Sequence, residues 1–140
     1  MCDVAKSENR IMSNILSFRD LDAWQAAMDL VATTYALAKK LPASEQFELA
    51  SQLRRAAVSV PSNVAEGHAG GTRARYLHHV RIALGSLAEL ETQLEIGRRL
   101  RFLPDDGLVQ SSGQIARTGQ LLHGLARSLR LTPPKDSSDA

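Results

Sequence analysis

The sequence is poor in aromatic residues and almost without cysteine. Phe, Trp and Tyr make up 4% of its 140 residues although 44% are hydrophobic, so a core must be built from Leu, Ile, Val and Ala. That composition favours helices, because strands draw on aromatic and β-branched residues. The single cysteine, Cys2, excludes an internal disulfide, and we expect it to be an inert thiol in a reducing cytoplasm.

Targeting and membrane segments are also lacking. Residues 1–17 mix charged and polar side chains without an apolar signal-peptide region, and no run is long enough to cross a bilayer. We expect a flexible lead there, with translation starting at Met1 or at Met12, because the helical pattern begins only at Phe18. The formal charge of +2 is too small to commit the chain to nucleic acid by composition alone.

Hydrophobic residues recur at intervals of three and four from Phe18 to Leu41 and in three later stretches, as in the helices of a bundle. Pro42 ends the first helix. Its core-facing positions are expected to be Leu21, Trp24, Met28, Val31, Tyr35 and Ala38. The second helix is expected to begin at an N-cap on Ser44. Its core-facing positions are expected to be Phe47, Ala50, Leu53, Ala57, Val60 and Val64.

The second half of the chain repeats this pattern twice. After the glycines at 67, 70 and 71, Thr72 can cap a third helix. Its core-facing positions are expected to be Tyr76, Val80, Ala83, Leu87, Leu90, Leu94, Gly97 and Arg101. A fourth helix is expected to open with Pro104 in its first turn. Its apolar stripe is expected to be Leu108, Ile115, Leu122, Leu125 and Leu129.

The predicted fold is therefore all-α, an antiparallel up-down-up-down four-helix bundle over residues 18–130, followed by a disordered tail at 131–140. Four glycines predict that the fourth helix is the least stable, unless they permit close contact with a neighbour.

Pro61 lies inside the second helix, where it removes one backbone hydrogen bond. Because the hydrophobic pattern resumes beyond it, we expect a kink and not an end. Asn63 and Glu66 share a helix face there. They are either a ligand-facing pair or, as we prefer, side chains that satisfy backbone groups freed by Pro61 and anchor the loop after Gly67.

Groupings typical of catalysis or metal binding do not occur. No i,i+4 pair exists among the histidines His68, His78, His79 and His123. No Glu-x-x-His pair supports a metal site in the bundle core, and Glu91 and Glu95 are expected to pair with Arg98 and Arg99. No His and Asp partners are evident for Ser59, Ser62 and Ser86. The prediction is a non-enzymatic protein without cofactor or metal.

Positive charge is the one hint of function. It gathers in the second helix and the start of the third, at Arg54, Arg55, Arg73, Arg75 and Arg81, with His78 and His79. These residues contact RNA or DNA, or they form a solvated face with interface salt bridges. A single bundle would offer patches of modest affinity, whereas a ring of bundles would repeat them and gain by multivalency.

A combination of short motifs is specific although each is weak alone. They are Phe18, Leu21 and Trp24; Leu41-Pro42 with Glu45; residues 52–57; Ser59-Val60-Pro61; residues 63–67; and Ile82-Ala83, Gly85-Ser86-Leu87 and Glu89-Leu90. With these residues, from about Phe18 to Leu125, the chain resembles the four-helix-bundle family first noticed as products of intervening sequences inside bacterial 23S rRNA genes.

The resemblance implies a cytosolic bacterial bundle that assembles into a pentameric ring with a central channel and has no assigned biochemical role. A related branch, the accessory variability determinant of diversity-generating retroelements, is similar and binds a reverse transcriptase and nucleic acid through basic surfaces. This chain departs from its relatives after Gly67, where they carry basic residues and it has His68-Ala69-Gly70-Gly71. A phosphate contact by that loop would be weaker or shifted here.

Two functions remain open. One is a homo-oligomeric scaffold that contacts RNA or DNA through Arg54, Arg55, Arg73, Arg75 and Arg81. In this scaffold the subunit geometry is expected to be set by the turn from Pro61 to Gly67 and by Gly85 and Ser86. These two small residues would let another helix approach closely. The other is a protein-docking accessory subunit, for example for a reverse transcriptase, without its own nucleic-acid binding. Salt dependence separates the two. A third interpretation, a bundle enzyme with a buried metal, lacks the ligands.

Overall fold

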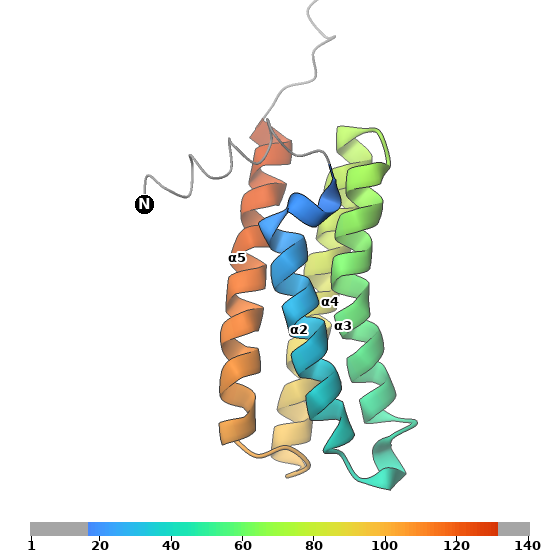
Figure 1. Ribbon diagram of the computed structural model, residues 1–140, viewed down its shortest axis with the longest axis vertical. Coiled ribbons are helices and arrows are strands. Elements are labelled where there is room, and N and C mark those ends of the chain that lie inside the picture. The colour runs from blue at the N-terminus through green and yellow to red at the C-terminus, as the bar shows by residue number, and fades with distance from the viewer. Residues whose placement is uncertain (1–16, 132–140) are drawn as a thin grey trace, which may run out of the picture.

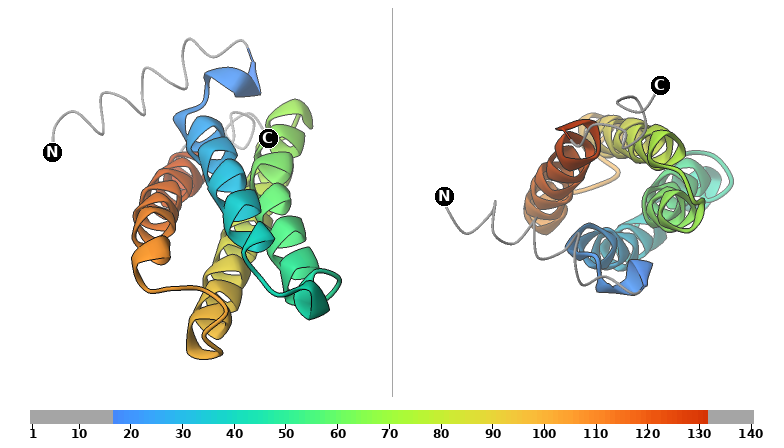
Figure 2. Two further views of the ribbon diagram at one scale, coloured as in Figure 1. Left: turned by 60° about the horizontal axis from the view of Figure 1, so that its bottom comes forward. Right: turned by 90° about the horizontal axis from the view of Figure 1, so that it is seen from above.

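The computed structural model describes residues 17–131, which form a four-helix bundle (Figure 1). Its long helices are α2 (Asp22–Lys39), α3 (Leu49–Ala69), α4 (Arg73–Arg99) and α5 (Val109–Leu131). Short 3-10 helices precede α2, α3 and α5, namely η1 (Phe18–Asp20), η2 (Ala43–Glu45) and η3 (Asp106–Leu108). Each long helix packs against its neighbours in the chain, and α2 closes the ring of four against α5 (Figure 2). The predicted all-α bundle is confirmed.

The predicted lead at 1–17 and tail at 131–140 fall, apart from Ser17 and Leu131, outside the described residues. No helix within residues 17–131 is long and apolar enough to span a membrane.

The core is a column of aliphatic side chains to which every long helix contributes. Leu30, Leu53, Leu90 and Leu122, one from each helix, are fully buried. Burying a side chain of this size contributes about 1.5–3 kcal/mol. The low aromatic content is therefore no obstacle to a well-filled core.

The buried face of α2 differs from the predicted one, although Leu21 and Ala38 are buried as predicted. Its buried residues are Ala23, Ala27, Leu30, Thr34, Leu37 and Ala38. Met28 and Tyr35, predicted to face the core, are 40% and 41% exposed, and Trp24 and Val31 are only partly buried. Both sets of positions recur at threes and fours, and the alanine-rich set allows the closer approach of neighbouring helices. Thr34 can be buried because its hydroxyl donates to the carbonyl of Leu30 at 2.7 Å.

Helix α3 begins at Leu49, later than predicted, so Ser44 is not its N-cap. The preceding turn is held by Gln46, whose side-chain amide donates to the carbonyls of Ala38 and Leu41 at 3.1 and 3.0 Å. Phe47 lies in this turn and is 92% exposed, so its predicted place in the core is wrong. Farther along, α3 continues through Pro61 without a break, as the resumed pattern predicted.

The bounds of α4 and α5 also correct the prediction. Thr72 caps α4 as expected, its side chain accepting from the amide of Arg75 at 3.2 Å. The helix ends at Arg99, and Arg101 lies beyond it with a φ of 61°, so it does not belong to the core-facing row. Pro104 does not open α5, which begins at Val109 after η3. Of its glycines, Gly119 contacts α4, because a Cβ there would lie 3.4 Å from Leu87.

Candidate functional site

The structure separates the five arginines that the sequence grouped together. Contacts between Ser59 and Ser86 set the register of the antiparallel pair α3 and α4, which places Arg55 level with Leu90. At 1.5 Å rise per residue, Arg54 and Arg55 therefore lie roughly 22–27 Å along the bundle from Arg73 and Arg75. They cannot belong to one compact patch.

Arg54 and Arg75 each have a structural partner. Arg54 is half-buried and donates from Nη2 to the carbonyl of Gln46 at 3.0 Å, which holds the turn before α3. Arg75 forms an ion pair with Glu66 on α3, 3.6 Å between Nη2 and Oε1, across the loop between the helices. Both side chains of this pair are more than half exposed, so it contributes only about 0–1 kcal/mol.

A different set of basic residues does come together. Contact between Leu87 and Gly119 sets the register of α4 and α5, so the last turns of α5 lie beside the first turns of α4. The first sixteen residues of α4, up to Ala88, contain no Asp or Glu, and neither does the whole of α5. Here we define the basic surface as the exposed residues Arg73, Arg75, Arg81, Arg127 and Arg130.

Sequence reasoning missed Arg127 and Arg130 as neighbours of the α4 arginines. The separation of some fifty residues hides their proximity, which follows only from the antiparallel register. The absence of carboxylates from the fourth helix was the available signal. Glu66 is the acidic group that faces this end of α4, through its pair with Arg75.

A chain of polar groups joins α3 to α4. Ser59 and Ser86 share a hydrogen bond of 2.8 Å between their hydroxyl oxygens. The amide of Asn63 donates to the carbonyl and hydroxyl of Ser59, which leaves Asn63 Oδ1 as the acceptor for His79 Nδ1 at 3.0 Å. The His79 proton is thereby placed on Nδ1, and Nε2 faces Glu66 Oε1 at 3.9 Å.

These polar contacts support a structural role for Asn63 and Glu66, although the groups that the two side chains contact are not the predicted ones. The carbonyl that Pro61 leaves without its i,i+4 donor is that of Ala57, whereas Asn63 donates to Ser59. Glu66 forms an ion pair with Arg75 and so ties the end of α3 to the start of α4. Gly67 is required between them, because a Cβ there would lie 2.8 Å from His79 Cβ.

Gly85 and Ser86 differ in what they contact. Ser86 is buried against α3, as a small residue at a helix contact should be. A Cβ on Gly85 would meet nothing within 4 Å, so no helix of the same protomer approaches it. Its predicted role between subunits stays a prediction.

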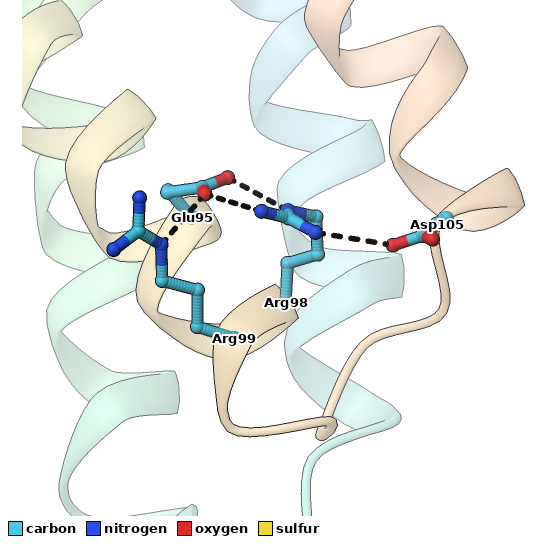
Figure 3. A network of polar contacts seen from close by, with 4 residues as sticks. All are labelled: Glu95, Arg98, Arg99 and Asp105. Carbon is cyan, nitrogen blue, oxygen red and sulfur yellow. Dashed lines mark hydrogen bonds and ion pairs between the residues drawn. The ribbon is translucent and has the colours of Figure 1, made fainter.

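Glu95 stands at the centre of an exposed cluster at the other end of α4 (Figure 3). Arg98 donates to both of its carboxylate oxygens at 2.6 and 2.9 Å, and Arg99 donates to Oε1 at 3.0 Å. Hydrogen bonds from Arg98 and Arg99 lower the pKa of Glu95 to about 2. Arg98 also faces Asp105 at 3.7 Å and so tethers the loop that leads to α5. The predicted pairing of Glu95 with both arginines is confirmed, whereas Glu91 forms no ion pair with a described residue.

Tyr76 is the one described residue whose pKa is shifted mainly by burial, which raises it to about 12. Its ring packs edge-on against His68 at 5.6 Å between centroids. Within residues 17–131, no group of three or more His, Cys, Asp or Glu side chains could hold a metal ion.

An open groove of about 1500 Å³ lies between α4 and α5. Its walls carry apolar side chains, among them Leu84, Leu87 and Ile115. Small residues line it as well, namely Gly85, Ala88, Ser112, Ala116 and Gly119. Its shape allows close approach of a further helix.

The family model described as 23S rRNA-intervening sequence protein matches residues 19–124, which contain α2, α3 and α4 and the larger part of α5. The chain belongs to this family. A comparison with curated proteins gives no match.

Membership of the 23S rRNA-intervening sequence protein family confirms the resemblance inferred from the motifs. The matched range contains the α3–α4 polar chain and most of the basic surface, and it ends before Arg127 and Arg130.

Proposed function

We propose that this protein is a non-enzymatic, cytoplasmic, homo-oligomeric bundle, pentameric as the resemblance implies, that associates with RNA or DNA through its basic surface. The observation that carries the nucleic-acid part is the side-by-side placement of two acid-free helical segments that together carry five exposed arginines. Arginine suits this task because its planar guanidinium can form bidentate hydrogen bonds with phosphate and stays charged.

The distribution of charge favours nucleic-acid binding at the end of the bundle where α4 begins over binding at the opposite end. At the opposite end, Glu95 and Asp105 face the arginines of α4 and offset their charge. Arg54 is committed to the turn before α3. The proposal therefore keeps Arg73, Arg75 and Arg81 from the original set and adds Arg127 and Arg130.

Assembly would multiply a modest interaction. A single bundle offers a few phosphate contacts, each released by salt, whereas several copies in a ring present the same surface repeatedly to one nucleic acid. Light scattering on a sizing column, with absorbance at 260 and 280 nm, tests both parts on protein purified at low salt without nuclease. A mass of five chains with excess absorbance at 260 nm is expected. A clean monomer without nucleic acid would overturn the proposal.

Substitution of single arginines tests the surface itself. Arg81→Glu is expected to weaken binding of a labelled RNA and to reduce the slope of log affinity against log salt, because phosphate contacts are lost and repulsion is added. Arg55→Glu is the matched control, since Arg55 is also an exposed helical arginine but lies outside the basic surface. Equal losses in the two variants would refute the assignment of the surface.

A second function, protein docking without nucleic-acid binding, is favoured by one observation. Large apolar side chains are exposed at the end of the bundle away from the basic surface: Phe47 is 92% exposed, Val109 72% and Leu100 57%. Such residues anchor protein interfaces more often than phosphate contacts. Binding to a partner through them would change little between low and high salt, in contrast to binding of RNA.

A further inference from the structure

The bundle leaves one apolar helix face uncovered on α2. Met28 and Tyr35 are 40% and 41% exposed, and Ala32 and Ala36 beside them are exposed too. These residues, with Gln25 at one end and Lys39 at the other, form a stripe that we call the α2 face. Its position explains why the periodicity of α2 was misleading, because a second apolar stripe runs beside the buried one.

The groove between α4 and α5 matches the α2 face in length. On α4 its walls run from Leu84 to Arg98, fifteen residues or about 21 Å at 1.5 Å per residue. The α2 face, from Gln25 to Lys39, has the same number of residues. Small groove residues such as Gly85, Ala88 and Ala116 leave room for the larger Met28 and Tyr35.

Charge sets the direction in which the two surfaces fit. At the α4 C-terminal end the groove carries Glu91, Glu95 and Asp105 against Arg98, and Arg99 also bonds Glu95, so that one negative charge is in excess among these residues. At the other end it carries His123 and no acid, together with Arg127, which the assembly would share between this contact and the basic surface. Helix α2 has the reverse polarity, because Asp22 begins it and two exposed lysines, Lys39 and Lys40, end it.

In the up-down topology α2 and α4 run in the same direction. A copy standing beside another in the same orientation therefore brings the start of its α2 to the basic end of the groove, and its lysines to the acidic end. Turned upside down, the copy would oppose like charges at both ends, which costs affinity and excludes that arrangement.

We propose that the α4–α5 groove of one copy receives the α2 face of the next copy, both in the same orientation. The inference rests on the proposed homo-oligomer and assigns its interface. Because the groove and the α2 face are different surfaces, the contact is heterologous, and copies add until a ring closes. A two-fold dimer, in which one surface meets itself, is not expected.

Two single substitutions block the two surfaces separately. Gly85→Arg fills the groove without disturbing the protomer, since a Cβ there meets no atom within 4 Å. Met28→Arg places a charge in the middle of the α2 face. Gly113→Arg and Ile82→Arg are the matched controls: Gly113 is an equally open helical glycine outside the groove, and Ile82 is 38% exposed on α4 away from both surfaces.

Light scattering is expected to show monomers for both blocking variants and the wild-type mass for both controls, with circular dichroism confirming that all four are folded. An equimolar mixture of Gly85→Arg and Met28→Arg should form a species of two chains and nothing larger, because one good groove then meets one good α2 face. In a Cys2→Ser background, Ala32→Cys on one chain and Ser112→Cys on the other should be joined by a short thiol cross-linker.

Wild-type mass in either blocking variant, or cross-links between two copies of Ala32→Cys in preference to the mixed pair, would overturn this interface and leave the proposed oligomer standing. A monomeric wild type would overturn both. Loss of RNA binding in an intact oligomer would concern the basic surface alone.

Discussion

Replacing Gly67 by alanine is expected to destabilise the bundle, although alanine is the better helix former. Gly67 is buried near the end of α3, where α4 passes close to it. An added Cβ would lie 2.8 Å from His79 Cβ, 3.1 Å from Tyr76 Cδ1 and 3.3 Å from the Tyr76 carbonyl oxygen. None of these atoms is the free end of a flexible side chain, so α3 and α4 must move apart.

The magnitude follows from two opposing terms. Overpacking a close contact costs about 1–3 kcal/mol, and alanine recovers about 1 kcal/mol of helix propensity. Separation of the helices would also lengthen the bond between Asn63 and His79, now 3.0 Å, which contributes roughly another 1 kcal/mol. The net expectation is a loss of about 1–3 kcal/mol, which lowers the Tm by roughly 4–12 °C for a domain of this size.

Thermal and urea unfolding followed by circular dichroism measures this effect at one fixed protein concentration. Gly113→Ala is the matched control, because Gly113 is also helical and a Cβ there meets nothing within 4 Å. It should gain about 0.5–1 kcal/mol. A gain for Gly67→Ala equal to that of the control would refute the close approach of α3 and α4.

Three further outcomes are expected. Phe47→Ser should change stability by no more than about 0.5 kcal/mol, whereas Leu53→Ala, at a fully buried position, should cost about 2–5 kcal/mol in the same urea assay. Absorbance titration at 295 nm in a Tyr35→Phe background should place the Tyr76 pKa near 12 in the folded protein and near 10 in concentrated urea. Because the folded pKa is the higher one, the associated stability is present below pH 10 and lost as the pH rises towards 12. A midpoint near 10 in both states would contradict the burial of the phenol. Ser86→Ala should cost about 0.5–1.5 kcal/mol by removing the hydroxyl bond to α3, and unfolding at an unchanged urea midpoint would argue against that bond.

The sequence predicted the architecture because periodicity, caps and breaks agreed with one another. In α4 the row containing Val80, Leu87 and Leu94 is buried as expected, and Thr72 caps the helix. In α2 the same reasoning failed, because two apolar stripes overlap and periodicity alone cannot tell which one faces its own bundle.

The candidate surface was harder to predict for a related reason. Arg54 and Arg75 look equivalent along the chain, but one holds a turn and the other lies at the far end of the bundle. The proximity of Arg81 and Arg127 depends on the register between α4 and α5, which no local pattern contains. The type of each residue is known from the sequence, but which residues lie on one surface depends on how the helices pack.

The hydrogen-bonded polar groups between α3 and α4 affect how precisely the two helices are aligned along their axes. Seams made only of leucine and alanine tolerate a slip, because each turn presents a similar surface to the next. Here a slip of one turn, about 5.4 Å, would break the bond between Ser59 and Ser86 and that between Asn63 and His79 together, and would leave partly buried polar atoms without partners. The two hydrogen bonds therefore fix the register of α3 against α4, and α2 and α5 pack against a hairpin whose register is already defined.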